Sequence, residues 1–154
     1  MNKLIVPFLL LFLASCDNNL LFDENSSIDN MSWAQNDVKS FNYQVDDTLQ
    51  ACNFYMNIRH TEDFAFSNLY VFLKTEFPNG EAARDTMEFI LQEPDGKWKG
   101  SGAGSLRDNS IMFKQNLRFP LKGMYRFSFE QAMREPQLKG ISEIGLRIEK
   151  FQNP

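Results

Sequence analysis

The loop at residues 96–104 has the composition that binding of a phosphate group would require. It reads GKWKGSGAG, so glycines and lysines alternate within a few residues. A phosphate-binding loop needs the spacing Gly-x-x-x-x-Gly-Lys-Ser/Thr between a parallel strand and a helix, and neither the spacing nor the setting is present. The glycines more simply let the backbone turn between two strands. We therefore expect no nucleotide cofactor here.

The other residue types that carry out catalysis or bind metals are scattered along the chain. His60 is the single histidine, and a zinc site needs several such ligands. Gly100-Ser101-Gly102 lacks the Gly-x-Ser-x-Gly spacing of a serine hydrolase. A β-sandwich glycosidase needs two carboxylates facing each other across a cleft, and the sequence does not reveal such a pair. The carboxylates considered are Asp46, Asp47, Glu62, Asp63, Asp85 and Glu88. The sequence therefore predicts a protein that is not an enzyme and binds neither metal nor cofactor.

Cys16 stands in the one setting that indicates a definite covalent modification. Residues 1–3 carry a positive charge, residues 4–13 are apolar, and Ala14 and Ser15 are small, which is the pattern of an export signal with a cleavage site. The residues Leu13 to Cys16 resemble the bacterial lipobox, in which the cysteine thiol receives a diacylglycerol, the chain is cleaved before it, and the new amine is acylated. We expect a lipoprotein signal peptide over residues 1–15 and lipid attachment at Cys16.

A lipid at Cys16 would be the membrane anchor. The ten apolar residues rise only about 15 Å as a helix, half of a hydrocarbon core of about 30 Å, so the segment is too short to span a membrane. Each buried acyl carbon contributes about 0.8 kcal/mol, so two or three chains hold a protein essentially permanently. The alternative is an ordinary secretory signal with an incidental cysteine.

The remainder of the chain suits a single domain. The full chain is acidic, with 20 Asp and Glu against 16 Lys and Arg, and removal of Lys3 with the signal peptide increases the excess, which argues against nucleic acid as a partner. Cys52 is the only other cysteine, and we expect it to be a small buried thiol. Residues 16–30 are polar and turn-prone and are expected to be a lipidated tether, in which the apolar residues 20–22 add a short edge strand at most. Residues 31–154 are expected to form the domain.

Period-two alternation of apolar and polar residues predicts strands along most of this domain. The predicted strands cover residues 38–45, 54–59, 69–77, 84–91, 111–115, 124–130 and 143–150. Turn signals recur at about 8–12 residues, which favours an all-β fold, an antiparallel β-sandwich of about seven or eight strands, jelly-roll or immunoglobulin-like, with a barrel as the alternative. The 15 phenylalanines suit a core filled by aromatic rings. A helical turn is expected only at residues 131–135 or 81–84.

Several long stretches resemble the GldH family of gliding-motility lipoproteins. They are DTMEFIL at residues 85–91, EPDGKWKGSGAGSLRDN at residues 93–109 and FEQAMREPQLKGISEIGLRIEK at residues 129–150. Ser32-Trp33, the NxR of residues 57–59 and the SNLYVFL of residues 67–73 are similar to the same family. The resemblance therefore extends over nearly the whole predicted mature chain.

The resemblance implies an accessory lipoprotein of the cell envelope, required for surface gliding by bacteria that move without flagella or pili. It also implies partners among gliding-motility or type IX secretion proteins, and neither an enzymatic activity nor a small-molecule substrate. The location that it favours is the outer membrane with the domain facing the periplasm. The inner membrane and the cell surface remain alternatives.

Trp98, Arg134 and Arg147 lie within the family-like stretches and are candidate contacts for a partner protein. Arg and Trp are enriched at the residues that dominate binding energies at interfaces. The alternative roles are intramolecular: ion pairs of the two arginines with Glu135 and Glu149, and a cover for one end of the core in the case of Trp98. Trp98 also suggests a second function, a carbohydrate-binding module, which needs a platform of two or three exposed aromatic rings.

Overall fold

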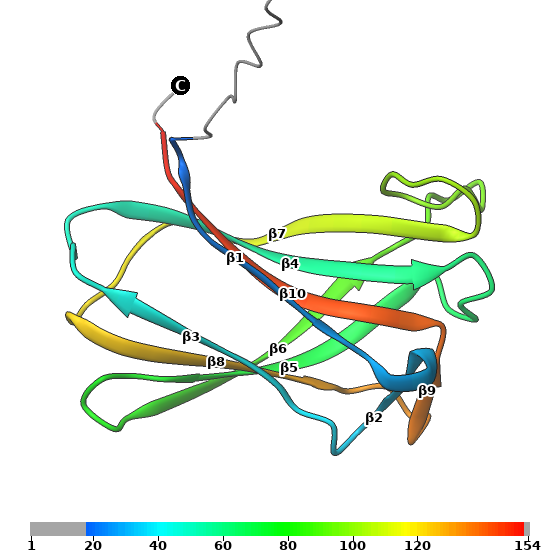
Figure 1. The fold of residues 1–154 in the computed structure, drawn as a ribbon, viewed down its shortest axis with the longest axis horizontal. Coiled ribbons are helices and arrows are strands. Elements are labelled where there is room, and N and C mark those ends of the chain that lie inside the picture. The colour runs from blue at the N-terminus through cyan, green and yellow to red at the C-terminus, as the bar shows by residue number, and fades with distance from the viewer. Residues whose placement is uncertain (1–17, 153–154) are drawn as a thin grey trace, which may run out of the picture.

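Residues 18–152 are described by the computed structural model, and their strands form two separate four-stranded antiparallel sheets (Figure 1). The predicted all-β antiparallel sandwich is therefore confirmed. The predicted signal peptide, residues 1–15, and Cys16 lie outside the described residues. The elements are β1 (Leu20–Ser27), the 3-10 turn η1 (Asp29–Met31), β2 (Ser32–Ala34), β3 (Lys39–Val45), β4 (Ala51–Thr61), β5 (Asn68–Glu76), β6 (Ala82–Ile90), β7 (Leu106–Arg118), β8 (Gly123–Gln131), β9 (Gln137–Lys139) and β10 (Ile141–Lys150).

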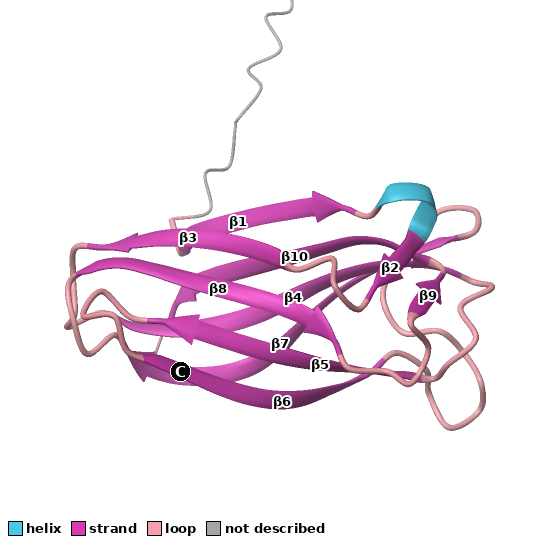
Figure 2. Ribbon diagram, turned by 90° about the horizontal axis from the view of Figure 1, so that it is seen from below, coloured by secondary structure: helices cyan, strands magenta, loops and turns pink. Residues whose placement is uncertain are grey.

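The order of strands places segments from distant parts of the chain side by side. One sheet has the order β1-β10-β4-β7, the other β3-β8-β5-β6, and β2 pairs with β9 in a separate two-stranded ribbon. The strands run lengthwise, and the connecting loops gather at the two ends of the sandwich (Figure 2). The last strand, β10, thus lies between β1 and β4. The first and last strands of the domain are therefore neighbours in one sheet.

The segment expected to be a tether contains a full strand. Residues 20–27 pair with β10 from Leu20↔Glu149 to Ser27↔Glu143. Their sequence, LLFDENSS, does not alternate cleanly because β1 is an edge strand with several exposed positions. The sheet therefore begins inside the range that was assigned to the tether.

Two other local expectations need correction. The strand predicted at residues 111–115 extends over Leu106–Arg118, because β4 pairs with its polar first half as well as with its apolar second half. No helix forms at residues 131–135, which are the end of β8 and a bend, while residues 82–84 belong to β6. Strands β2 and β9 were missed because three residues are too few to show a period.

Aromatic rings from both sheets fill the space between them. Phe54 of β4 lies 6.1 Å from Phe127 of β8, and Phe113 of β7 lies 6.3 Å from Phe129 of β8, measured between ring centroids. Contacts between aromatic rings of this kind add about 0.5–1.5 kcal/mol to the burial of the rings. Cys52 is buried as expected, and its burial raises the pKa of its thiol to about 11. This core holds the two sheets together.

We expect Phe129→Ala to lower the free energy of unfolding by about 3–5 kcal/mol, because Phe129 is fully buried and its truncation removes buried apolar surface and leaves a cavity. Met124 is on the same strand with 52% of its surface exposed, so Met124→Ala is the matched control, with an expected change within about 0.5 kcal/mol. Equilibrium unfolding in urea measures both. Equal effects of the two substitutions would contradict the packing described here.

Candidate functional site

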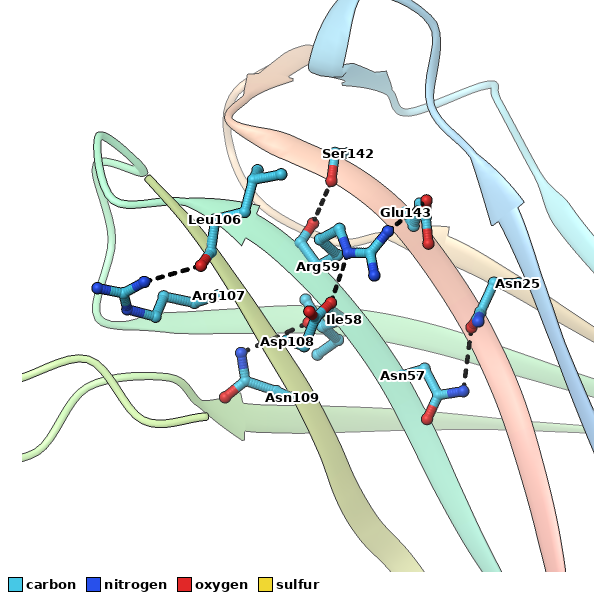
Figure 3. Close-up of polar contacts among 10 residues, drawn as sticks. All are labelled: Asn25, Asn57, Ile58, Arg59, Leu106, Arg107, Asp108, Asn109, Ser142 and Glu143. Atoms are coloured by element: carbon cyan, nitrogen blue, oxygen red, sulfur yellow. Dashed lines mark hydrogen bonds and ion pairs between the residues drawn. The ribbon is translucent and has the colours of Figure 1, made fainter. Parts of the chain in front are cut away.

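The outer face of the β1-β10-β4-β7 sheet carries three adjacent rows of side chains. Figure 3 draws Asn25, Asn57, Arg59, Asp108 and Glu143 from two of them. Each row crosses the strands, because residues paired in register point to the same face. The first row joins Glu143, Arg59 and Asp108; the second joins Asn25, Gly145, Asn57 and Ser110; the third joins Asp23, Arg147 and Tyr55. Together they form the polar face.

Arg59 holds the first row together. Its Nε donates to Asp108 Oδ1 at 2.5 Å and its Nη1 donates to Glu143 Oε1 at 2.8 Å. The hydrogen bond to Asp108 is the main reason that the pKa of Arg59 lies above its ordinary value. One guanidinium group thereby pairs with both carboxylates, and its remaining nitrogen, Nη2, has no partner within the described residues.

Amide groups form the central row. Asn57 Nδ2 donates to Asn25 Oδ1 at 3.0 Å and to Asp23 Oδ1 at 2.8 Å, while Asn57 Oδ1 accepts a bond of 2.9 Å from Ser110 Oγ. Gly145 lies between Asn25 and Asn57 in register, and a Cβ there would come within 2.6 Å of the carbonyl oxygen of Glu24 and would collide with the Asn25 amide. The missing side chain at Gly145 is what lets the two amides meet.

Arg147 holds the third row. Its Nη1 lies 2.8 Å from Asp23 Oδ2 on β1, and its Nε donates to Glu149 Oε1 at 2.6 Å on its own strand. Burial and the neighbouring charge of Glu149 raise the pKa of the Tyr55 phenol in the same row. The intramolecular pairing considered for Arg147 therefore exists, and Arg147 also ties the first strand to the last.

The polar face is hollowed into an open groove of about 510 Å³. Its lining includes Arg59, Arg147, Asn57 and Tyr55 from the rows, and Ser101 from the glycine-rich loop. Guanidinium, amide and carboxylate groups held in fixed positions offer hydrogen bonds in planar, bidentate geometry. Among residues 18–152, no three His, Cys, Asp or Glu side chains are placed to hold a metal ion. The guanidinium, amide and carboxylate groups of the groove are able to hold polar groups of a partner.

Trp98 is not the exposed ring that a carbohydrate platform requires. It is partly buried and packs against the core, with its ring 4.7 Å from that of His60. These contacts show that Trp98 covers one end of the core.

Arg134 lies exposed in the bend that follows β8, and it makes no ion pair with Glu135 or any other described residue. The three candidate residues do not meet: Trp98 and Arg134 lie at one end of the sandwich, and Arg147 lies on the polar face.

His60 is a fully buried polar residue at the end of β4. Its Nδ1 donates to the carbonyl oxygen of Thr61 at 2.8 Å, and its Nε2 has no hydrogen-bond partner. Burial lowers the pKa of the imidazole below its ordinary value, with a smaller contribution in the same direction from Arg107. The side chain is therefore neutral in the folded protein and acts as part of the core beneath Trp98.

Sequence reasoning missed the polar face itself. The alternation in residues 54–59 placed Asn57 and Arg59 on the side opposite the core, and that in residues 143–150 did the same for Arg147. The sequence did not reveal that β10 pairs with both β4 and β1. A face built from strands at opposite ends of the chain becomes visible only once the strand order is known.

These features define a small antiparallel β-sandwich with a polar, ion-paired sheet face. The family model described as "GldH lipoprotein" matches residues 20–148. The chain therefore belongs to the GldH lipoprotein family, as the resemblance in its sequence indicated.

Two relatives match over almost their whole length. A protein of Christiangramia forsetii, described as "Gliding motility lipoprotein GldH homolog", is 32% identical over 156 residues, covering 97% of this chain and 95% of that protein. A protein of Flavobacterium johnsoniae, described as "Gliding motility lipoprotein GldH", is 32% identical over 154 residues, covering 96% of this chain and 94% of that protein. The similarity thus covers the domain as a whole and not one motif.

Among solved structures, dimeric latent PorU from Porphyromonas gingivalis aligns with 86% of this chain and 13% of its own, at 10% identity and a TM-score of 0.31. A likeness this weak carries no argument about fold or function.

Membership of a lipoprotein family makes this a lipid-anchored protein of the cell envelope. Within residues 18–152 no helix has the length and apolar character needed to cross a membrane.

We expect Gly145→Ala to detach β1 locally from β10, because the added Cβ collides with the Asn25 amide and the Glu24 carbonyl. Hydrogen exchange of the amides in residues 20–27 should become faster, while exchange in β8 of the other sheet stays unchanged. Combining it with Asn25→Ala removes one collision but not that with the Glu24 carbonyl, so protection should return only in part. Unaltered exchange in β1 would contradict the close approach at Gly145.

His60 gives a prediction about pH. Because its folded-state pKa lies below the value of 6.5 for an exposed histidine, the unfolded chain takes up a proton that the folded chain does not. The resulting stability is full above about pH 6.5 and is lost as the pH falls through the folded-state pKa. Unfolding in urea between pH 7.5 and 5.5 measures the decline, and His60→Gln should reduce it. An imidazole titration by NMR with a midpoint at or above 6.5 would refute this account.

Proposed function

We propose that this protein is a non-catalytic, lipid-anchored accessory component of the bacterial gliding apparatus, which supports the assembly or stability of that apparatus or of the type IX secretion machinery. The lipid is attached at Cys16 after removal of residues 1–15. The domain lies in the periplasm at the inner face of the outer membrane. The partners are other envelope proteins of the gliding or secretion machinery.

The observation that carries this proposal is the match to gliding-motility lipoproteins along the whole chain. Both relatives align over more than nine-tenths of their length, so the domain that we describe corresponds to the whole of each relative rather than to a shared module. A role in gliding therefore accounts for the entire chain without a further function for any part of it.

The polar face supports a role in binding rather than in catalysis. Its carboxylates form ion pairs with Arg59 and Arg147, which hold the charged groups at fixed positions on the sheet. Fixed charges of both signs suit a polar partner surface, on which complementary charges select the partner and set its orientation.

Arg134 supports a second contact point at the end of the sandwich. An exposed arginine without an intramolecular ion pair has all five of its N–H donors available for a partner. Trp98 lies at the same end, where its ring packs on His60 and stabilises the structure of that end. We propose that this end and the polar face together contact the partner.

We expect Arg134→Glu to reduce gliding and the recovery of gliding or type IX components without changing the melting temperature, since exposed substitutions usually change stability by no more than about 0.5 kcal/mol. Arg126→Glu is the matched control, because Arg126 is exposed on β8 in the other sheet and lies outside both this end and the polar face. Colony spreading and a mild-detergent pull-down of the tagged, lipidated chain provide the readouts. Equal effects of both charge reversals would show that general charge, and not this contact, matters.

The pull-down should include the Cys16→Ser variant and metabolic labelling with a tagged fatty acid. Labelling that persists in Cys16→Ser would overturn lipid attachment at Cys16. Recovery of glycan without any protein partner would favour the carbohydrate-binding alternative over the assembly role.

A further inference from the structure

We propose that the end of the sandwich beside the anchor, formed by the β3–β4 and β7–β8 loops, docks against the lipid surface and holds the domain upright on the membrane. This inference rests on the proposed lipid at Cys16. The occupant of this end is the bilayer to which the chain is attached.

The first step is the short distance between the lipid and the folded domain. The backbone N–H of Lys150 donates to the carbonyl oxygen of Asn19 at 2.8 Å, so Asn19 is already held by the sheet. Three residue steps separate Cys16 from Asn19, and even a fully extended chain covers at most about 11 Å in that length. The headgroup region on one side of a bilayer is itself about 5–8 Å thick. The anchored end of the domain is therefore held at the membrane surface.

The second step is to establish which loops share this end. Leu20 at the start of β1 pairs with Glu149, Lys150 pairs with Cys52, and Ala51 pairs with Arg118. The start of β4 and the ends of β7 and β10 therefore lie together with the start of β1 (Figure 1). The β3–β4 loop, residues 46–50, crosses between the two sheets at this end, and the β7–β8 loop, residues 119–122, does the same.

The third step concerns the side chains that these loops expose. Leu49 has 78% of its surface exposed, the largest value among the large apolar side chains of the described residues. Asp47 fixes this loop, because its Oδ1 accepts a hydrogen bond of 2.8 Å from the backbone N–H of Leu49. Four further exposed apolar side chains surround the same end. They are Leu20, Leu117, Leu121 and Met124.

Exposed apolar side chains also occur at the opposite end, at Met31, Val38 and Ile90, and single ones are normal on any protein. The difference is position: only the side chains around Leu49 lie where the anchor keeps a bilayer within reach. Burying apolar area in the headgroup boundary strengthens the binding of a protein that is already anchored. Lys122 next to Leu121 is exposed and is able to extend its charge to the headgroups.

Docking at this end sets the direction in which the rest of the domain points. Strand β4 has 11 residues and at a rise of about 3.3 Å per residue extends for roughly 35 Å. Trp98, which packs on His60 near the end of β4, and Arg134, which follows the end of β8, are then presented away from the bilayer. The proposed partner contacts are thus kept clear of the lipid.

The experiment uses the lipidated chain in phosphatidylcholine vesicles, with the environment-sensitive dye NBD attached to a cysteine introduced as Leu49→Cys. The matched control is Asp95→Cys in the turn at the opposite end of the sandwich. Cys52 is buried and its thiol pKa is about 11, so it does not compete for the dye. We expect a blue-shifted emission and strong quenching by nitroxide headgroup lipids at position 49, and neither effect at position 95.

Equal emission and equal quenching at the two positions would overturn the docking. Mass spectrometry of the acyl group and flotation of the vesicles separate this failure from failure of the proposed anchor. Lipidated protein that floats, with an unquenched dye at position 49, refutes only the docking. Protein that carries no lipid and does not float refutes the anchor and the docking with it.

Discussion

The pairing of β10 with β1 on one side and β4 on the other is the constraint on which the rest of the molecule depends. It joins the first and last strands of the domain in one sheet. It brings Asp23 beside Arg147 and Asn25 beside Asn57, over separations of 124 and 32 residues. It also fixes the start of the domain four residues after Cys16. The polar face and the short connection to the anchor are consequences of the same strand order.

The ion pairs of the polar face contribute less to the stability of the fold than the aromatic core does. Exposed ion pairs contribute about 0.2–1 kcal/mol each, whereas burial of one large aromatic side chain accounts for several kcal/mol. Arg59, Arg147 and their partners are each a fifth to a half exposed. Their charges are thus not required to hold the two sheets together. The aromatic rings between the sheets do that. What the ion pairs do provide is fixed positions for charged groups on a surface that is open to a partner.

In the proposed arrangement, the two ends of one small sandwich serve different purposes. The end with Leu49 is the one next to the proposed lipid at Cys16, and the end with Trp98 and Arg134 lies a strand length away. The polar face lies between them on the outer side of the β1-β10-β4-β7 sheet, and Figure 3 draws part of it. A binding domain on a long, flexible tether would sample many orientations, but a connection of only a few residues restricts the domain to a layer next to the membrane. This arrangement suits a component that stabilises an assembly at the membrane surface.

The sequence by itself determined the features that depend on neighbouring residues. Alternation in residues 38–45, 69–77 and 143–150 marked their strands, the burial of Cys52 followed from its place in such a pattern, and long motifs identified the family. The strand order, the polar face, the space left at Gly145 and the length of the connection to Cys16 were decided only by the tertiary structure. Alternation shows which face of a strand is buried, but not which strand lies beside it. The three-residue strands β2 and β9 were not predicted, and of edge strand β1 only a short strand at residues 20–22 was considered, because partners distant in the chain, and not their own pattern, make these segments strands.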